Sequence, residues 1–512
     1  MQKSSSVCAL SLGAHAPIFE FAVNAGQTAE ETTKIPLALS QVCRAWRQSA
    51  LKHAPLWTNI LLGIRGDRSS ERASEFLGRS RTLPVRVTLD MQGARKEPPG
   101  LKERVGLLAP HAHRLYALRI QGATTALPIH QFLHDLDFPL TALKDFEIVW
   151  GKPTTKLARR FPVIFQGEVP GTLLPYLLNL LPHDKFINLT RFALKTHDRR
   201  LQVKLDQLLE ILGSSPTLQY LEIEGFYLPD EDEPYYDDDD QDTEKPILQL
   251  PKLRFLSLKQ CATSGGFLSR INVPDTTNVI LAANDPFVLD GGFHEEPPNI
   301  LYALPARFDE LSFFGKFRTI EFEILDSSIT MRASQPNGQY LLIEQVPDPD
   351  DIDNNTMEEM VLPSATCFTF SDFGPVTTLR ASNRLSGSKR DVLREAHSSE
   401  LPFCNSTMPH LEKLEFSYFP LNFFKHFAGD GKKPPVGAKD VVLTLYPDEC
   451  GDFGELKAWI KARAEAQLPF EKLEVTLDYS TATVDEKSVE SLRSSLTEYV
   501  KEAVVKVLHL PQ

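Results

Sequence analysis

Apolar and polar residues alternate in a short pattern, L-x-x-L-x-L, that recurs along the chain. Clear or looser copies lie at 115–120, 143–148, 189–194, 218–223, 253–258, 308–313, 411–416 and 470–475. Alternate apolar positions face the same side of an extended chain, so each copy predicts a β-strand with one buried face. The polar positions between them are expected to line the opposite face.

Segments between these strands have the spacing of amphipathic helices. In "VKLDQLLEILGSSP" (203–216), four leucines fall on one helical face, and Gly213 and Pro216 end the helix. The segments 68–80 and 455–467 predict two more helices of the same kind. Neighbouring motif copies start 28, 29 and 35 residues apart. The copy at 253–258 also carries Cys261, which completes the L-x-x-L-x-L-x-x-C strand signature of a leucine-rich repeat.

This combination predicts an α/β fold in which a solenoid of parallel strands alternating with helices occupies residues 57–325. The alternative is a set of unrelated strands in ordinary α/β domains. No clean motif copy occurs in 326–400, which predicts an irregular insertion or a long loop. The segment 401–512 resumes the repeat pattern.

The net charge of −13 is concentrated in one segment. Residues 230–244, "DEDEPYYDDDDQDTE", hold ten acidic residues and no Lys or Arg, so the remainder carries only −3. Like charges repel, so the segment predicts a solvated loop inserted at 229–245. A functional alternative is an acidic surface that attracts a basic substrate segment.

Charge and cysteine usage exclude several protein classes. No cluster of Lys and Arg resembles a nucleic-acid footprint, and no uncharged apolar run reaches the ~18 residues of a membrane helix. The six cysteines are scattered without a C-x-x-C pair, which favours reduced thiols in the cytoplasm or nucleus. A faint leader-like N-terminus and sequons at Asn188, Asn354 and Asn405 leave a secreted recognition protein as an alternative.

No catalytic, nucleotide or metal fingerprint is found, so we predict neither an enzyme nor a cofactor nor a metal site. His111 and His113 lack a third ligand at a diagnostic spacing. The acidic run that starts at Asp348 resembles a calcium loop by charge only, since Asp353 stands where that loop requires Gly.

The N-terminal region predicts a small helical unit over residues 14–60. "PLALSQVCRAWRQSALKH" (36–53) places Leu39, Val42, Cys43, Trp46 and Ala50 on one stripe of a single helix that opens with a proline. A second short helix is predicted over 16–25, and "LWTNILL" is expected to start the first strand. Because this unit is too small to bury its own apolar stripe, we expect a partner or the repeat array to cover part of it.

The residues of this region resemble the F-box-like domain found at the N-terminus of many fungal proteins. The matching positions, which include a V-C-R-x-W-R sequence, are Pro36, Leu39, Val42, Cys43, Arg44, Trp46, Arg47, Ala50, Pro55, Leu56 and Trp57. The segments 76–89 and 107–120 also resemble that family. The segment 13–25 departs from the L-P-x-E opening that is usual for an F-box.

The resemblance implies a substrate-recognition subunit of an SCF-type ubiquitin ligase, which performs no bond chemistry itself. Its F-box binds a Skp-type adaptor, which links it to a cullin scaffold, and its repeats bind a protein substrate. The residues expected at the adaptor are Ile18, Phe19, Leu39, Val42, Cys43, Trp46, Leu56 and Trp57. About half of them are expected to fill the junction with the solenoid instead, above all Trp57. A second hypothesis is a repeat scaffold, independent of the ubiquitin system, whose F-box-like helices are purely structural.

Overall fold

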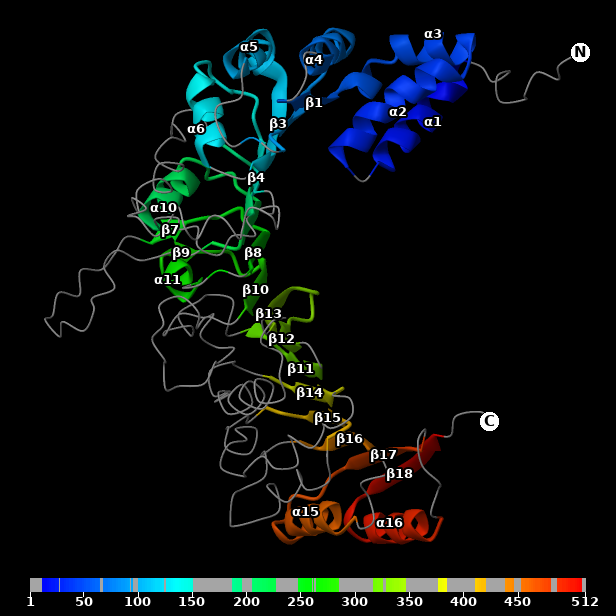
Figure 1. Cartoon of the computed structure of the whole chain (residues 1–512). Coiled ribbons are helices and arrows are strands. Elements are labelled where there is room, and N and C mark those ends of the chain that lie inside the picture. Colours follow the sequence, from blue (N-terminus) through cyan, green and yellow to red (C-terminus); the bar gives the residue numbers. More distant parts are fainter. Residues whose placement is uncertain are drawn as a thin grey trace, which may run out of the picture. The chain divides into compact units, whose positions relative to one another are not determined.

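The chain folds into two compact units, Met1–Phe255 and Leu256–Gln512, each of them a mixed α/β structure with a largely parallel sheet (Figure 1). The boundary falls inside the predicted array 57–325. The computed structural model describes residues 12–26, 28–64, 68–92, 94, 100–123, 126–150, 187–195, 205–226, 247–259, 261, 264–284, 316–325, 328–346, 376–384, 410–419, 438–445, 453–479 and 486–508.

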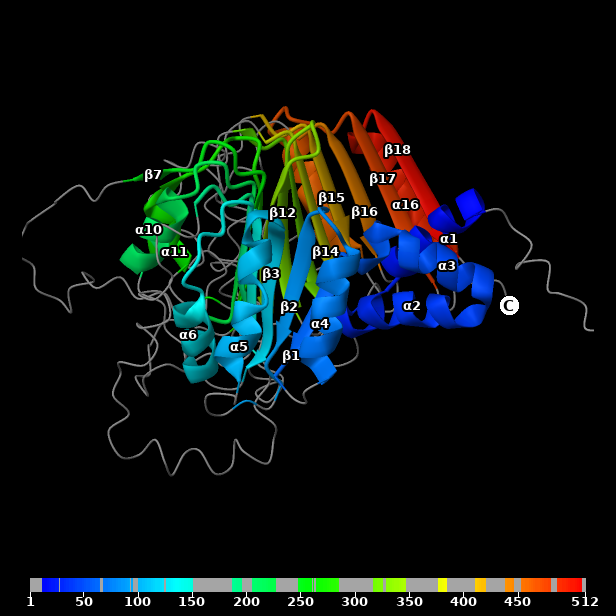
Figure 2. The ribbon, with the colours of Figure 1, turned by 90° about the horizontal axis from the view of Figure 1, so that it is seen from above.

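The first unit begins with helices and continues with strands and helices in alternation. Its helices are α1 (Leu12–Asn24), α2 (Ala29–Val42), α3 (Arg44–Lys52), α4 (Arg68–Arg79), α5 (Leu101–Gly106), α6 (Ala126–Asp135) and α10 (Leu205–Gly213), with 3-10 turns η2 (Ala54–Trp57) and η3 (Ala109–Arg114). Its strands are β1 (Asn59–Gly63), β2 (Val85–Asp90), β3 (Leu115–Ala123), β4 (Asp145–Trp150), β5 (Arg191–Lys195), β6 (Tyr220–Glu224) and β7 (Leu248–Gln249). Strands β1 to β6 pair in parallel in chain order, with α5, α6 and α10 along one face (Figure 2).

The motif copies of the first unit lie in register. Their fourth and sixth positions form two buried rows across β3 to β6: Leu118, Phe146, Phe192 and Leu221, and Ile120, Ile148, Leu194 and Ile223. The rings of Phe146 and Phe192 are 6.0 Å apart. Because period-two apolar residues must share one face, the common register builds a continuous core beneath the helices.

Among the described strands of the second unit, one runs antiparallel to both of its neighbours. Its elements are β8 (Phe255–Lys259), which includes the boundary, α11 (Ser264–Ser269), β9 (Ile271–Asn272), β10 (Asn278–Asn284), β11 (Thr319–Leu325), β12 (Ser328–Ser334), β13 (Tyr340–Val346), β14 (Thr378–Asn383), β15 (Lys413–Ser417), β16 (Asp440–Leu445), α15 (Gly454–Glu465), β17 (Lys472–Asp478), α16 (Glu486–Tyr499) and β18 (Glu502–Leu508). The strand order is β10-β13-β12-β11-β14-β15-β16-β17-β18. β12 is antiparallel to β11 and β13, and the other pairs are parallel.

Seven of the eight motif copies lie on strands, and the predicted helices over 68–80, 203–216 and 455–467 are confirmed as α4, α10 and α15. The eighth copy, 308–313, and the acidic insertion 229–245 lie outside the described residues. The interval 326–400 is not wholly irregular, since it holds β12, β13 and β14. β12 and β13 form a hairpin around Asn337 and Gly338, whose positive φ of 87° suits a tight turn. Antiparallel strands of this kind carry simple alternation without the repeat motif.

The prediction of a single helix over 36–53 is wrong in two respects. Cys43 is extended, with φ −157° and ψ 173°, so the chain forms two helices, α2 and α3. The first of these begins at Ala29 and not at Pro36, which lies inside it. A capping box sets this start: the Thr28 hydroxyl accepts from the Glu31 amide at 3.1 Å, and the Glu31 carboxylate accepts from the Thr28 amide at 3.1 Å.

Replacing Thr28 with alanine is expected to destabilise the first turn of α2 by about 1 kcal/mol, because the Glu31 amide loses its side-chain acceptor. Hydrogen exchange of the α2 amides measures the loss. Thr497→Ala on α16 is the matched control, since that threonine caps no helix start and its hydroxyl bonds only within its own helix. Equal exchange in Thr28→Ala and the unchanged chain would contradict the role of the cap.

Candidate functional site

The three N-terminal helices pack around a small aromatic core. Phe19 of α1 is fully buried, and its ring meets the Trp46 ring of α3 edge to face at 5.1 Å. His15 is also buried, and its Nδ1 is 2.9 Å from the Ser49 hydroxyl. These contacts join one face of α1 to α3 and leave its opposite face at the surface of the three helices.

Trp57 connects these helices to the sheet of the same unit. Its side chain is fully buried, and its indole N–H donates to the Ala50 carbonyl at 2.8 Å. Its ring meets Phe76 of α4 edge to face at 4.9 Å, and the Arg79 guanidinium lies 4.5 Å from the ring centroid. Trp57 therefore contacts α3 on one side and α4 on the other, and acts as the structural joint of the first unit.

The eight residues predicted at an adaptor divide into two groups. Phe19, Trp46, Leu56 and Trp57 are buried within the first unit. Ile18 and Val42 are exposed, while Leu39 and Cys43 are half-buried. The break at Cys43 explains the division, because it turns Trp46 into the core while Val42, at the end of α2, stays at the surface.

Among the described side chains of α1 to α3, four large apolar ones are exposed, and we call Ile18, Phe21, Val42 and Leu51 the exposed apolar set. Phe21 is 77% exposed and Val42 56%. Single exposed apolar side chains are common on protein surfaces, whereas a contiguous group of them indicates a binding surface. The sequence prediction missed Phe21 and Leu51. The signal for Phe21 was present, because Ala14, Ile18 and Phe21 of α1, together with Ala25 just beyond it, follow the spacing of a second apolar stripe.

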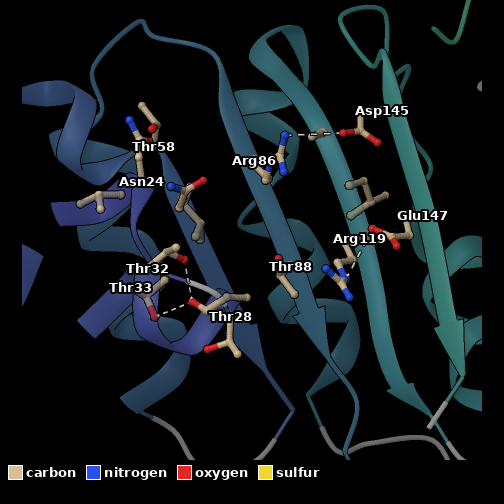
Figure 3. A pocket seen from close by; sticks show the side chains of 17 residues that line it. Asn24, Thr28, Thr32, Thr33, Thr58, Arg86, Thr88, Arg119, Asp145 and Glu147 are labelled. Carbon is tan, nitrogen blue, oxygen red and sulfur yellow. Dashed lines mark hydrogen bonds and ion pairs between the residues drawn. The ribbon is translucent and has the colours of Figure 1, made fainter. Parts of the chain in front are cut away.

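A pocket of about 480 Å³ lies between α1 and α2 on one side and the polar face of β1 to β4 on the other (Figure 3). The helical wall contributes Asn24 and three threonines, Thr28, Thr32 and Thr33. The strands contribute the charged side chains Arg86, Arg119, Asp145 and Glu147. These charged residues occupy polar positions of the strands, so the repeat pattern itself directs them into the pocket.

Ion pairs organise the charged wall of the pocket. Arg86 reaches across the small Ala117, and its guanidinium lies 3.5 Å from the Asp145 carboxylate on the strand beyond. Arg119 is 3.6 Å from Glu147. Arg191 on β5 bridges the same two carboxylates, at 3.1 Å from Asp145 and 3.6 Å from Glu147. Burial lowers the pKa of Arg191, but the two carboxylates outweigh it and hold that pKa above its usual value.

Beside this network, Tyr220 lies between a cation and a second ring. The Arg191 guanidinium is 4.7 Å from its centroid, the Phe255 ring is stacked at 4.6 Å, and its hydroxyl donates to Glu222 at 2.9 Å. Burial, followed by the hydrogen bond to Glu222 and the charge of that carboxylate, raises the pKa of Tyr220 to about 12.

The raised pKa of Tyr220 makes stability fall at alkaline pH. The unfolded phenol releases its proton near pH 10 and the folded one near 12, so the folded state holds more protons in that window. The stabilisation is complete below pH 10 and is lost as the pH rises through 12. Unfolding titrations of the unchanged chain and of Tyr220→Phe measure the effect, and parallel curves between pH 10 and 12 would contradict it.

His111, one of the two histidines considered as metal ligands, belongs to a structural contact. His111 Nδ1 is 3.3 Å from the buried Arg114 guanidinium, and burial together with that charge lowers the pKa of His111. Within the described ranges, no three His, Cys, Asp or Glu side chains are grouped as metal ligands. Over the same ranges, no helix has the length and apolarity required to cross a bilayer.

Comparison with known proteins adds no assignment. No protein-family model matches the chain, and no curated protein matches it.

Proposed function

We propose that this protein is a substrate-recognition subunit of an SCF-type ubiquitin ligase. In this proposal α1 to α3 form an F-box-like domain that binds a Skp-type adaptor, and through it a cullin scaffold. The strands and helices that follow form an irregular leucine-rich-repeat solenoid that binds a protein substrate. The protein acts in the cytoplasm or nucleus, without a cofactor, and raises the local concentration of substrate near the ubiquitin-conjugating enzyme.

The observation that carries the proposal is the exposed apolar set. Three short helices leave Ile18, Phe21, Val42 and Leu51 accessible although they bury Phe19 and Trp46. A helix that is apolar on two faces normally packs with both, whereas α1 packs against α2 and α3 and leaves Phe21 on its outer face exposed. A second protein subunit that covers the outer face accounts for this composition, and it agrees with the resemblance of residues 36–57 to F-box-like sequences.

The register of the motif copies supports the proposal that the strands and helices after α3 bind a protein substrate. Parallel strands with buried leucine rows and helices on one face leave the opposite face lined by polar side chains, which is the usual binding surface of such arrays.

The experiment is an affinity purification of the tagged chain from a fungal host under proteasome inhibition, with quantification of the Skp-type adaptor and the cullin. The proposal predicts that both are retained in amounts comparable to the bait. A chain that purifies with neither would leave the alternative, a repeat scaffold independent of the ubiquitin system. That alternative is favoured by the burial of Trp46 and Trp57, which shows that part of the F-box-like sequence serves packing.

A further inference from the structure

The positive and negative side chains in the charged wall of the pocket are not equally exposed to solvent. The guanidinium side chains of Arg86 and Arg119 are 54% and 43% exposed, whereas Asp145 and Glu147 are only 16% and 12% exposed. The carboxylates thus lie beneath the cations and hold them in place. A molecule that approaches this part of the sheet meets guanidinium groups first.

The guanidinium groups are the charged donors of the pocket, and the hydroxyls of several of its threonines are already engaged. The hydroxyls of Thr32 and Thr33 donate to the Ala29 carbonyl, and that of Thr58 donates to Pro55. Arg86 and Arg119 each have one ion-pair contact, at 3.5 and 3.6 Å, although a guanidinium has five N–H groups. An anionic oxygen in the pocket can therefore be bound without breaking an existing hydrogen bond of these threonines.

We infer that this pocket binds an acidic side chain, Asp or Glu, of an extended peptide segment in a protein partner. The two arginines and the two carboxylates balance within the pocket, so a single negative charge is accommodated by the exposed cations. A phosphorylated side chain would be attracted by the same guanidinium groups, so the titration includes a phosphoserine peptide as the competing ligand. The inference deepens the proposed function, on which it rests for the identity of the partner as a substrate.

The aromatic stack of Tyr220 and Phe255 adds a second contact on the same face. Tyr220 lies on β6, three strands from Arg119 on β3, which corresponds to roughly 14 Å at the usual strand spacing. An extended peptide spans that distance with about four residues. Half-buried aromatic rings beside an arginine are typical of binding hot spots. The substrate segment should therefore carry an aromatic residue about four positions from its acidic residue.

The test is a fluorescence anisotropy titration of the full chain with a labelled Gly/Ser peptide that carries two adjacent glutamates and a phenylalanine four positions later. The peptide should bind, and its affinity should fall as salt is raised from ~0.05 to ~0.5 M. Replacement of its glutamates by glutamine should weaken binding at least about tenfold, and replacement of its phenylalanine by serine should weaken it less.

Protein variants locate the site. Arg86→Gln and Arg119→Gln should each weaken binding about tenfold, while Asp145 and Glu147 keep Arg191 as a partner and the fold is retained. Arg380→Gln is the matched control, because that exposed arginine also forms ion pairs on a strand, with Glu321 and Glu415, but in the second unit. The affinity of Arg380→Gln for the glutamate peptide should equal that of the unchanged chain.

Three results would overturn the inference: equal binding of the glutamate and glutamine peptides, equal loss in Arg380→Gln and Arg86→Gln, or tighter binding of a phosphoserine peptide than of the glutamate peptide. The peptide titration needs no adaptor. A chain that binds the peptide but no Skp-type adaptor would contradict the proposed function and leave the acidic-peptide site standing. A chain that binds the adaptor but not the peptide would contradict the acidic-peptide site and leave the proposed function standing.

Discussion

Replacing Ile18 and Phe21 together with aspartate is expected to abolish retention of a Skp-type adaptor while the chain stays folded. Both side chains are exposed, so their loss removes little packing within the protein, and surface changes of this kind usually alter stability by less than about 1 kcal/mol. At an interface, the same change leaves two carboxylates buried against apolar groups. That cost is several kcal/mol, which corresponds to a loss of affinity of more than about a hundredfold.

The measurement is a pull-down of a purified fungal Skp-type adaptor by the tagged chain, with circular dichroism as the check on folding. The matched control is the double variant Tyr116→Asp with Leu468→Asp, which places two aspartates on exposed apolar positions outside α1 to α3. This control should retain the adaptor like the unchanged chain. Retention by the Ile18/Phe21 variant would show that the exposed apolar set is not the adaptor surface.

Replacing Trp57 with alanine is expected to destabilise the first unit by about 3–5 kcal/mol, the usual range for a buried Trp-to-Ala change. The change removes a fully buried indole, its hydrogen bond to Ala50 and its edge-to-face contact with Phe76. The substitution leaves a cavity where α3, η2 and α4 meet. The N-terminal helices should therefore lose their attachment to the sheet before the rest of the unit unfolds.

Urea unfolding followed by circular dichroism measures this loss, and hydrogen exchange of α1 to α3 shows whether the helices open first. Trp57→Phe provides the comparison, because it keeps most of the ring contact with Phe76 but removes the indole N–H. Trp57→Phe should lower the free energy of unfolding clearly less than Trp57→Ala. A cost below about 1 kcal/mol for Trp57→Ala would contradict the role of Trp57 as the structural joint.

The strands could be predicted because their signal is local. In a parallel sheet with one buried face, the buried residues of each strand repeat every second position, so the motif alone marks Phe146, Phe192 and Leu221 as equivalent sites. The hairpin of β12 and β13 was missed because antiparallel strands need only simple alternation. The break at Cys43 was missed because a helical stripe can be drawn through it, and its extended backbone depends on packing and not on the spacing of apolar residues.

The functional residues were predicted less completely for a related reason. The sequence identifies apolar side chains but not whether the same chain covers them, so Phe19 and Phe21 look equivalent until α1 is packed. The pocket depends on pairings between strands that are far apart in sequence, such as Arg191 with Asp145. The polar positions of the motif were visible, but their ion pairs follow only from the strand order and register.

Hydrogen exchange of the full chain with and without a purified Skp-type adaptor tests the central claim most directly, namely that α1 to α3 present an adaptor-binding surface. We predict added protection in residues 14–25 and 37–52, and no change in strands β3 to β6, whose polar face remains open for a substrate. An adaptor that gives no protection in 14–25 and 37–52, or protects only β3 to β6, would contradict the account.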